Sequence, residues 1–294
     1  MKRRISHYQS VTEIGYATAK KLLPLYRHKN NPHRFTWPQL ATCVLMTFYL
    51  DCSYRDMEDW LLVSDAICRS LDLQEVPDHT TLCRAFHRLD IRLLRGMQRL
   101  LLQKASVKEV AIGIDSTGFR TDQASAYYSF RNGRPKKDWV KGAYAVGVAS
   151  QLILGTRSSY GRYQDAVLLN SLRRQSKSYV IRNYVILADA GFDGRQVKLG
   201  DIIPPVRRHG TLRAPERIAR AELVGQARLD GLYGQRWKCE TVHSVIKRKF
   251  GDTVRSRTTR LHFREAFVLD FLFTTLCNRA IIFLLMEVFR VHAH

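Results

Sequence analysis

The sequence predicts an α/β domain preceded by an all-helical domain, because the spacing of apolar residues changes once along the chain. Over roughly the first hundred residues, apolar side chains recur every three or four positions, the spacing of a helix with one buried face. From residue 108 onward, short apolar runs bounded by Gly, Ser and Asn alternate with helical patterns, as in proteins that pack helices on a sheet. We therefore expect a helical domain over residues 1–106 and an α/β domain over residues 107–294.

The N-terminal domain contains three clear helical segments. Apolar residues fall on one helical face over residues 37–50 and again over residues 55–71. Asp78 is a typical N-cap for a third helix, which begins immediately after it. Arg84 and Arg88 lie one turn apart on this helix, where a helix-turn-helix-like protein contacts DNA, although an ordinary basic amphipathic helix has the same pattern.

The α/β domain has four apolar runs of strand length, at residues 110–114, 143–149, 152–154 and 184–188. Helical patterns follow at residues 163–174 and from residue 232 onward. Residues 204–229 contain three prolines and many arginines, so we expect a short insertion of low regularity there.

The chain is strongly basic. It has 48 Lys and Arg against 26 Asp and Glu, and this formal net charge of +22 is spread over its whole length. Such an excess repels itself unless a polyanion shares it, so nucleic acid is the first partner to consider. On charge alone, a membrane surface or ribosomal RNA fits as well.

No segment has the pattern of an export signal. The N-terminus is basic but lacks the apolar stretch of a secretory signal, and the six cysteines form no Cys-x-x-Cys pair. The most apolar region, residues 267–289, contains Asp270, Arg279 and Glu287, which a bilayer core tolerates poorly. We expect a buried core helix there and a cytoplasmic, nucleoid-associated protein without membrane contact.

Two aspartates have matching sequence contexts. Asp115 follows the apolar run Ala-Ile-Gly-Ile, and Asp189 follows Val-Ile-Leu-Ala. Each is therefore expected at the exposed carboxyl end of a buried strand, which is where ligands bind in open α/β sheets. An aspartate that merely forms a turn has the same context.

A charged helix over residues 232–250 supplies a third carboxylate. Five polar residues lie on one face of this helix at offsets of 0, 3, 7, 10 and 14: Tyr233, Arg236, Glu240, His243 and Lys247. The simple interpretation is a solvated face, since Arg236 and Glu240 form an i, i+4 pair. The alternative is catalytic, because two Asp on strands and one Glu on a helix can bind two magnesium ions for phosphoryl transfer.

Basic and polar groups near these carboxylates are expected to bind DNA. Arg236 and Lys247 would hold phosphates of the strand being cut, and Tyr233 would donate a hydrogen bond to one of them. His243 shares this face and would orient water or phosphate, although an ordinary hydrogen-bonding role is the simpler interpretation. Two basic loops flanking the site are expected to contact phosphates through five residues: Arg134, Lys136, Lys137, Arg255 and Arg257.

The spacing Tyr-x-x-Arg-x-x-x-Glu, followed after six residues by Lys, resembles the signature of a large group of DDE transposases encoded by prokaryotic insertion sequences. The chain carries this pattern without deviation as Tyr233, Arg236, Glu240 and Lys247. Further stretches resemble the same family along nearly the whole chain, at residues 53–56, 77–82, 189–193 and 251–257.

The resemblance implies an RNase H-like core, a mixed sheet with helices on both faces, with the aspartates on its first and fourth strands. It implies that Asp115, Asp189 and Glu240 are the catalytic carboxylates and bind two Mg²⁺ ions, for which Mn²⁺ can substitute. It also implies an enzyme that cuts double-stranded DNA at element ends and transfers the cut strand into target DNA as a homodimer. The domain over residues 1–106 would bind DNA and multimerise.

The resemblance has a limit, and two rival functions stay open. Larger relatives carry a long β-rich insertion, whereas only 50 residues, 190–239, lie between Asp189 and Glu240 here. The resemblance therefore does not extend to the functions of that insertion, such as support for hairpin formation at the DNA end. The rivals are an RNase H-like metal-dependent nuclease without strand transfer and a catalytically inactive DNA-binding protein.

Overall fold

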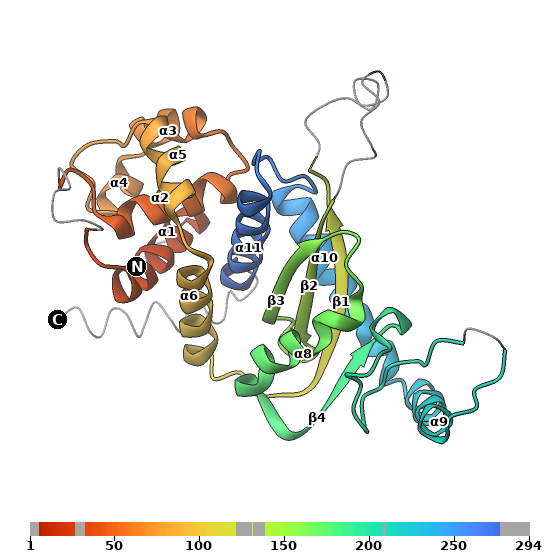
Figure 1. Ribbon diagram of the computed structural model, residues 1–294. Coiled ribbons are helices and arrows are strands. Elements are labelled where there is room, and N and C mark those ends of the chain that lie inside the picture. Colours follow the sequence, from red (N-terminus) through yellow and green to blue (C-terminus); the bar gives the residue numbers. More distant parts are fainter. Residues whose placement is uncertain (1–5, 27–32, 122–130, 132–138, 208–209, 277–294) are drawn as a thin grey trace. The chain divides into compact units, whose positions relative to one another are not determined.

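The structure is a computed structural model that describes residues 6–26, 33–121, 131, 139–207 and 210–276 (Figure 1). The chain divides into two compact units. The first comprises Met1–Ala105 with Val268–His294, and the second comprises Ser106–Phe267. Among the described residues, no helix is both long and apolar enough to cross a membrane.

The N-terminal region is helical, as predicted. Its helices begin at capping residues that the sequence supplies: Thr36 and Ser53 both form capping boxes, and Asp78 accepts hydrogen bonds from two backbone N–H groups. The helices are α1 (His7–Leu22), α2 (Trp37–Tyr49), α3 (Tyr54–Leu62), α4 (Asp65–Ser70), α5 (His79–Arg88) and α6 (Ile91–Lys104).

The single helix expected over residues 55–71 is two helices, so that prediction was wrong. Helix α3 ends at Leu62, and Ser64 takes a non-helical conformation with φ −113° and ψ 61°. The Ser64 carbonyl then accepts hydrogen bonds from the backbone N–H groups of Ile67 and Cys68, which start α4. The apolar spacing runs through this break and does not reveal it.

The second unit is built on a four-stranded sheet whose strand order is β3-β2-β1-β4. Strand β1 (Glu109–Phe119) pairs antiparallel with β2 (Val140–Gly147) on one side and parallel with β4 (Val180–Ala188) on the other. Strand β3 (Ile153–Tyr160) completes the sheet as an antiparallel neighbour of β2. Beyond β4, Ile202 forms an isolated parallel bridge with Leu187.

Helices cover both faces of this sheet. A Cβ on Gly113 would meet Cys239 of α10 (Trp237–Phe250), and a Cβ on Gly155 would meet Gln175 of α8 (Asp165–Ser176). Gly113 pairs with Val146 of β2, whereas Gly155 pairs with Ala145, the preceding residue. Because successive strand residues point to opposite faces, α10 and α8 lie on opposite sides of the sheet. The predicted mixed α/β fold is confirmed.

The segment between Asp189 and Glu240 is more regular than predicted, because it contains the helix α9 (Pro215–Leu229). Pro215 occupies the first helical turn, where its missing N–H leaves no hydrogen bond unmade, and the rest is rich in Ala, Arg, Glu and Leu. Val224 and Ala227 of α9 are buried in a cluster with Leu187 and Ile202. The prediction of low regularity was wrong, because Pro215 begins a helix and does not interrupt one.

Asp193 fastens α9 to the segment that follows β4. Its side chain is only 4% exposed, and it accepts hydrogen bonds from Arg217 at 2.8 Å, from the Val206 backbone N–H at 2.8 Å, and from Arg220. The fastened segment also contains Asp189, which directly follows β4. Asp193 is therefore a structural anchor close in sequence to a predicted catalytic residue.

Replacing Asp193 with Asn is expected to lower the free energy of unfolding by about 3 kcal/mol, because it leaves Arg217 and Arg220 without their counter-charge. Urea unfolding would measure the change. Asp230→Asn is a matched control at the C-terminal end of α9, where the carboxylate is exposed, and should stay within about 0.5 kcal/mol of the unmodified chain. Equal stability of the two variants would contradict the anchoring role.

Candidate active site

Asp115 lies inside β1 and does not end it. The sequence predicted a strand end at Asp115, but Ser116, Thr117 and Gly118 continue the ladder with β2. The parallel ladder with β4, in contrast, stops at Ile114 and Ala188. Asp115 thus occupies the position where its parallel neighbour ends. It points to the same face as Gly113, toward α10.

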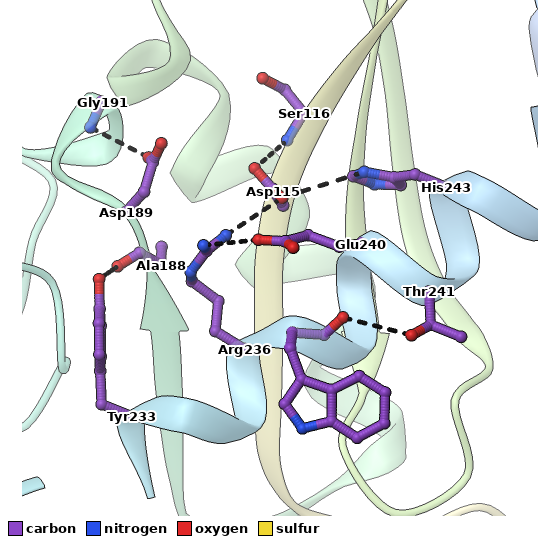
Figure 2. Close-up of polar contacts among 11 residues, drawn as sticks. Asp115, Ser116, Ala188, Asp189, Gly191, Tyr233, Arg236, Glu240, Thr241 and His243 are labelled. Atoms are coloured by element: carbon purple, nitrogen blue, oxygen red, sulfur yellow. Dashed lines mark hydrogen bonds and ion pairs between the residues drawn. The ribbon is translucent and has the colours of Figure 1, made fainter. Parts of the chain in front are cut away.

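Asp189 comes directly after β4, as predicted. Since Ala188 pairs with Ile114, Asp189 follows β4 at the level where Asp115 follows Ile114 on β1. Its carboxylate caps the short 3-10 helix η2 (Ala190–Phe192) by accepting a hydrogen bond from the Gly191 N–H at 3.0 Å. Asp115 thus lies within β1, and Asp189 lies just beyond the end of the adjacent strand β4 (Figure 2).

Helix α10 brings Glu240 to the same place. Cys239 is buried directly over β1, where a Cβ on Gly113 would come within 2.4 Å of its Sγ. Only glycine at position 113 lets the helix approach the strand this closely. Glu240, the next residue along, thereby lies beside Asp115, which is two residues after Gly113 (Figure 2).

Arg236 joins two of the three carboxylates. One guanidinium nitrogen lies 3.2 Å from Asp115 Oδ2, and the other lies 2.8 Å from Glu240 Oε1 (Figure 2). The i, i+4 pair with Glu240 follows from the sequence, whereas the contact with Asp115 arises only from the packing of α10 on β1.

The charge of the site changes the acidity of Asp115. Its pKa is raised to about 6, mainly by burial; the neighbouring Asp189 and Glu240 also raise it, while the Ser116 N–H and Arg236 lower it. Asp189 and Glu240 are therefore close enough to Asp115 to oppose its ionisation. Asp115 is thus a buried acid surrounded by like charges, which is typical of functional sites.

His243 lies beside Asp115, with its Nδ1 3.9 Å from Asp115 Oδ2. Its ring is buried against Tyr144, and no described residue hydrogen-bonds to its Nε2. Its pKa is lowered to about 4, mainly by burial and also by Lys247 and Arg236, so the imidazole is neutral at physiological pH. The ring thus contacts Asp115 through Nδ1, and its predicted contact with water or phosphate stays a prediction.

Tyr233 precedes α10 instead of belonging to it. The helix expected over residues 232–250 starts with a 3-10 turn, η3 (Tyr233–Arg236), and becomes α-helical at Trp237. The Tyr233 hydroxyl donates to the carbonyl oxygen of Ala188 at 3.4 Å, so it contacts the residue immediately before Asp189. Further along α10, the Lys247 ammonium lies 6.0 Å from the centre of the Phe119 ring.

The basic loop after α10 is held by a carboxylate that the sequence analysis missed. Glu265 of α11 (Thr259–Leu276) is buried and accepts the backbone N–H groups of Arg255 at 2.7 Å and Ser256 at 2.9 Å. The side chains of Arg255 and Arg257 remain exposed. Nothing in the local sequence marks Glu265, because its partners are nine or ten residues earlier.

The other predicted DNA contacts lie elsewhere. Arg84 and Arg88 are exposed on α5, in the first unit. Arg134, Lys136 and Lys137 lie outside the residues that the structure describes. Lys141 and Asp165 form a further ion pair, of 2.9 Å, near Gly191.

Comparison with known protein families identifies the chain. A family model of the transposase DDE domain matches residues 107–276, more than half of the sequence and the whole candidate site. The chain belongs to the DDE transposase family. A search of curated proteins finds no match. The transposase thus has the RNase H-like α/β core of its family, and it acts on DNA.

Transposases of this family generally use divalent metal ions, and the donors present here suit Mg²⁺. Three carboxylates provide only oxygen ligands, and a single arginine among them leaves an excess of negative charge. As placed, however, no three Asp, Glu, His or Cys side chains of the described residues are close enough together to hold a metal ion. The donor chemistry fits the ion, and Arg236 bonds to two of the three donors.

Proposed function

We propose that this transposase cuts the ends of an insertion sequence and joins the cut strand to target DNA by magnesium-dependent phosphoryl transfer, with Asp115, Asp189 and Glu240 as the metal ligands. One observation carries the proposal. Three acids that are far apart in the sequence come together, because Arg236 bonds to both Asp115 and Glu240 and Asp189 follows the strand next to Asp115 at the same level.

Bound metal ions would give this cluster of three carboxylates a catalytic role. When bound, two magnesium ions supply the positive charge that stabilises the attacking and leaving oxygens of the phosphodiester, and Mn²⁺ can replace them. The three carboxylates hold this charge in place, from a strand, from the end of an adjacent strand and from a helix. Catalysis is then mainly positioning and charge neutralisation, with no covalent protein intermediate.

The neighbouring side chains have supporting roles. His243 is neutral and buried, so it supports Asp115 without adding charge. Tyr233 fixes the backbone just before Asp189 through its bond to Ala188, which favours a positioning role over the predicted phosphate contact. Arg236 and Lys247 supply positive charge for the phosphates of the bound strand.

Binding of duplex DNA needs a larger surface than this site. The rigidly held loop with Arg255 and Arg257, and the exposed face of α5 with Arg84 and Arg88, offer arginines for the phosphate backbone. We propose that the domain over residues 1–106 binds the element ends and multimerises. The domain over residues 107–294 would be catalytic, and a homodimer would pair the two ends.

A joining assay tests the proposal. The purified chain is incubated with Mg²⁺, a labelled DNA duplex ending in the inverted repeat found beside its gene, and a supercoiled target plasmid. We expect cut ends and, with a pre-cut duplex, labelled DNA joined to the plasmid. Cutting without joined product would favour the nuclease, and binding without cutting would favour the inactive DNA-binding protein.

A further inference from the structure

Arg236 occupies the position of a counter-ion among the candidate metal ligands. Its guanidinium lies 3.2 Å from Asp115 Oδ2 and 2.8 Å from Glu240 Oε1, so it neutralises an oxygen of each carboxylate (Figure 2). The Arg236 side chain is 23% exposed and the Asp115 side chain 15% exposed, so water screens their contact only in part.

A metal ion and this guanidinium would compete for the same oxygens. Both are cations, and in a half-buried site their repulsion is weakly screened. In the arrangement observed, no described group of three possible ligands is close enough together to hold a metal ion. In the same arrangement, Arg236 holds one oxygen of Asp115 and one oxygen of Glu240 against its guanidinium.

We propose that Arg236 keeps the metal site closed in the free protein, and that a DNA phosphate opens it by drawing the guanidinium away from Asp115 and Glu240. The inference rests on the proposed function in one respect, that these two carboxylates bind metal. Arg236 is then a positioning residue that acts through them, and it makes loading of the metal depend on DNA.

A phosphodiester is a suitable competitor for the guanidinium. Arginine binds phosphate through two parallel N–H donors, as it binds a carboxylate, so the exchange replaces one pair of charge-assisted bonds by another. The Glu240 side chain is 60% exposed, so a phosphate can approach this end of the pair from solvent. By thermodynamic linkage, DNA and metal must then raise each other's affinity by the same factor, about tenfold or more.

The test is a titration of the full chain with Mn²⁺, in which electron paramagnetic resonance measures the free ion. It is performed with and without a short blunt DNA duplex at low salt. Mn²⁺ bound by the duplex alone is subtracted, and Asp115→Asn identifies the binding that depends on the site. For the unmodified chain we expect site binding at least about tenfold tighter with DNA.

Arg236→Gln removes the guanidinium. Without DNA, this variant is expected to bind Mn²⁺ at least about tenfold more tightly than the unmodified chain, and DNA should add little. Arg248→Gln is the matched control, because Arg248 is an exposed arginine on the same helix that hydrogen-bonds to the Ser244 carbonyl. It removes the same charge and should leave both Mn²⁺ affinities unchanged.

Arg236→Lys is a second variant, for the case that Arg236→Gln does not fold. Its single ammonium cannot match the two-pronged contact, so it should give an intermediate affinity without DNA. Unchanged Mn²⁺ affinity in the folded Arg236 variants would overturn the inference and leave the metal ligands in place. Absence of any Asp115-dependent Mn²⁺ binding, with or without DNA, would overturn the metal assignment and the inference with it.

Discussion

Replacing Asp115 with Asn is expected to lower the rate of DNA cleavage about a thousandfold, equivalent to about 4 kcal/mol of lost transition-state stabilisation. The amide keeps the size of the side chain but removes the charge that would hold the metal. Single-turnover cleavage of a labelled element end measures the effect. Binding of the same DNA, followed by gel shift, should be retained, because the proposed phosphate contacts are made by arginines and lysines. Cleavage within tenfold of normal would remove Asp115 from the proposed catalytic set.

The same substitution should stabilise the protein at neutral pH. In the folded protein the Asp115 pKa is raised from 3.8 to about 6, mainly by burial. A raised pKa means that folding favours the protonated acid, so this contribution to stability is complete below about pH 4 and is lost as pH rises through about 6. At pH 7.5 the buried, ionised carboxylate therefore destabilises the fold. Replacing it with Asn should raise the free energy of unfolding by about 1–3 kcal/mol.

Urea unfolding in EDTA at pH 7.5 and at pH 4 measures this pH dependence. Asp115→Asn should be the more stable protein at pH 7.5, and its advantage should shrink or disappear at pH 4. The comparison within one pair of proteins cancels the opposite effect of His243, whose lowered pKa weakens the fold as pH falls toward 4. An advantage that is the same at both pH values would contradict the raised pKa of Asp115.

The part of the site that the sequence could predict is the part governed by local spacing. The i, i+4 relation of Arg236 and Glu240, and the strand before Asp189, follow from helical and strand periodicity, and both are present in the structure. The prediction of one continuous helix from residue 232 was wrong, because Tyr233 lies in the 3-10 turn η3 and the α-helix begins at Trp237. A 3-10 turn has three residues per turn, so residues three apart still share a face and the sequence pattern survives.

What the sequence could not predict depends on contacts between distant segments. The bond between Arg236 and Asp115 joins residues 121 positions apart, and it requires that α10 pack closely on β1. The buried roles of Asp193 and Glu265 likewise come from partners on other elements. Strand β1 was predicted too short for the same kind of reason, because Ser116 and Thr117 are polar and are held in the sheet by pairing with β2. The apolar composition of a strand indicates which of its residues are buried, but it does not show how far the hydrogen-bonded pairing extends.

The close approach of α10 to β1 leads to the second large effect. Gly113→Ala places a Cβ within 2.4 Å of the Cys239 Sγ, and Cys239 is 1% exposed, so the sulfur has little room to move. The helix must shift away from the strand, which should destabilise the protein by about 2 kcal/mol. The shift would also move Glu240 relative to Asp115, and a displacement of about 1 Å can lower the rate of a positioned reaction about a hundredfold.

Cys239→Ala offers a matched rescue, because it removes the atom that the new methyl group meets. Alone it should lower the free energy of unfolding by about 1 kcal/mol, since it leaves a small cavity. In the double variant Gly113→Ala/Cys239→Ala the two changes should offset each other and recover most of the stability and the cleavage rate. Urea unfolding and single-turnover cleavage of all four proteins form the double-mutant cycle.

Gly113→Ala/Cys239→Ser sharpens the test, because the serine hydroxyl restores an atom at the position of the sulfur. This pair should remain defective in both measurements, whereas the pair with alanine recovers. Additive losses in the alanine pair would mean that the contact between β1 and α10 does not set the position of Glu240. Recovery would trace the lost activity to helix–strand spacing, because neither Gly113 nor Cys239 carries a group that can act on DNA.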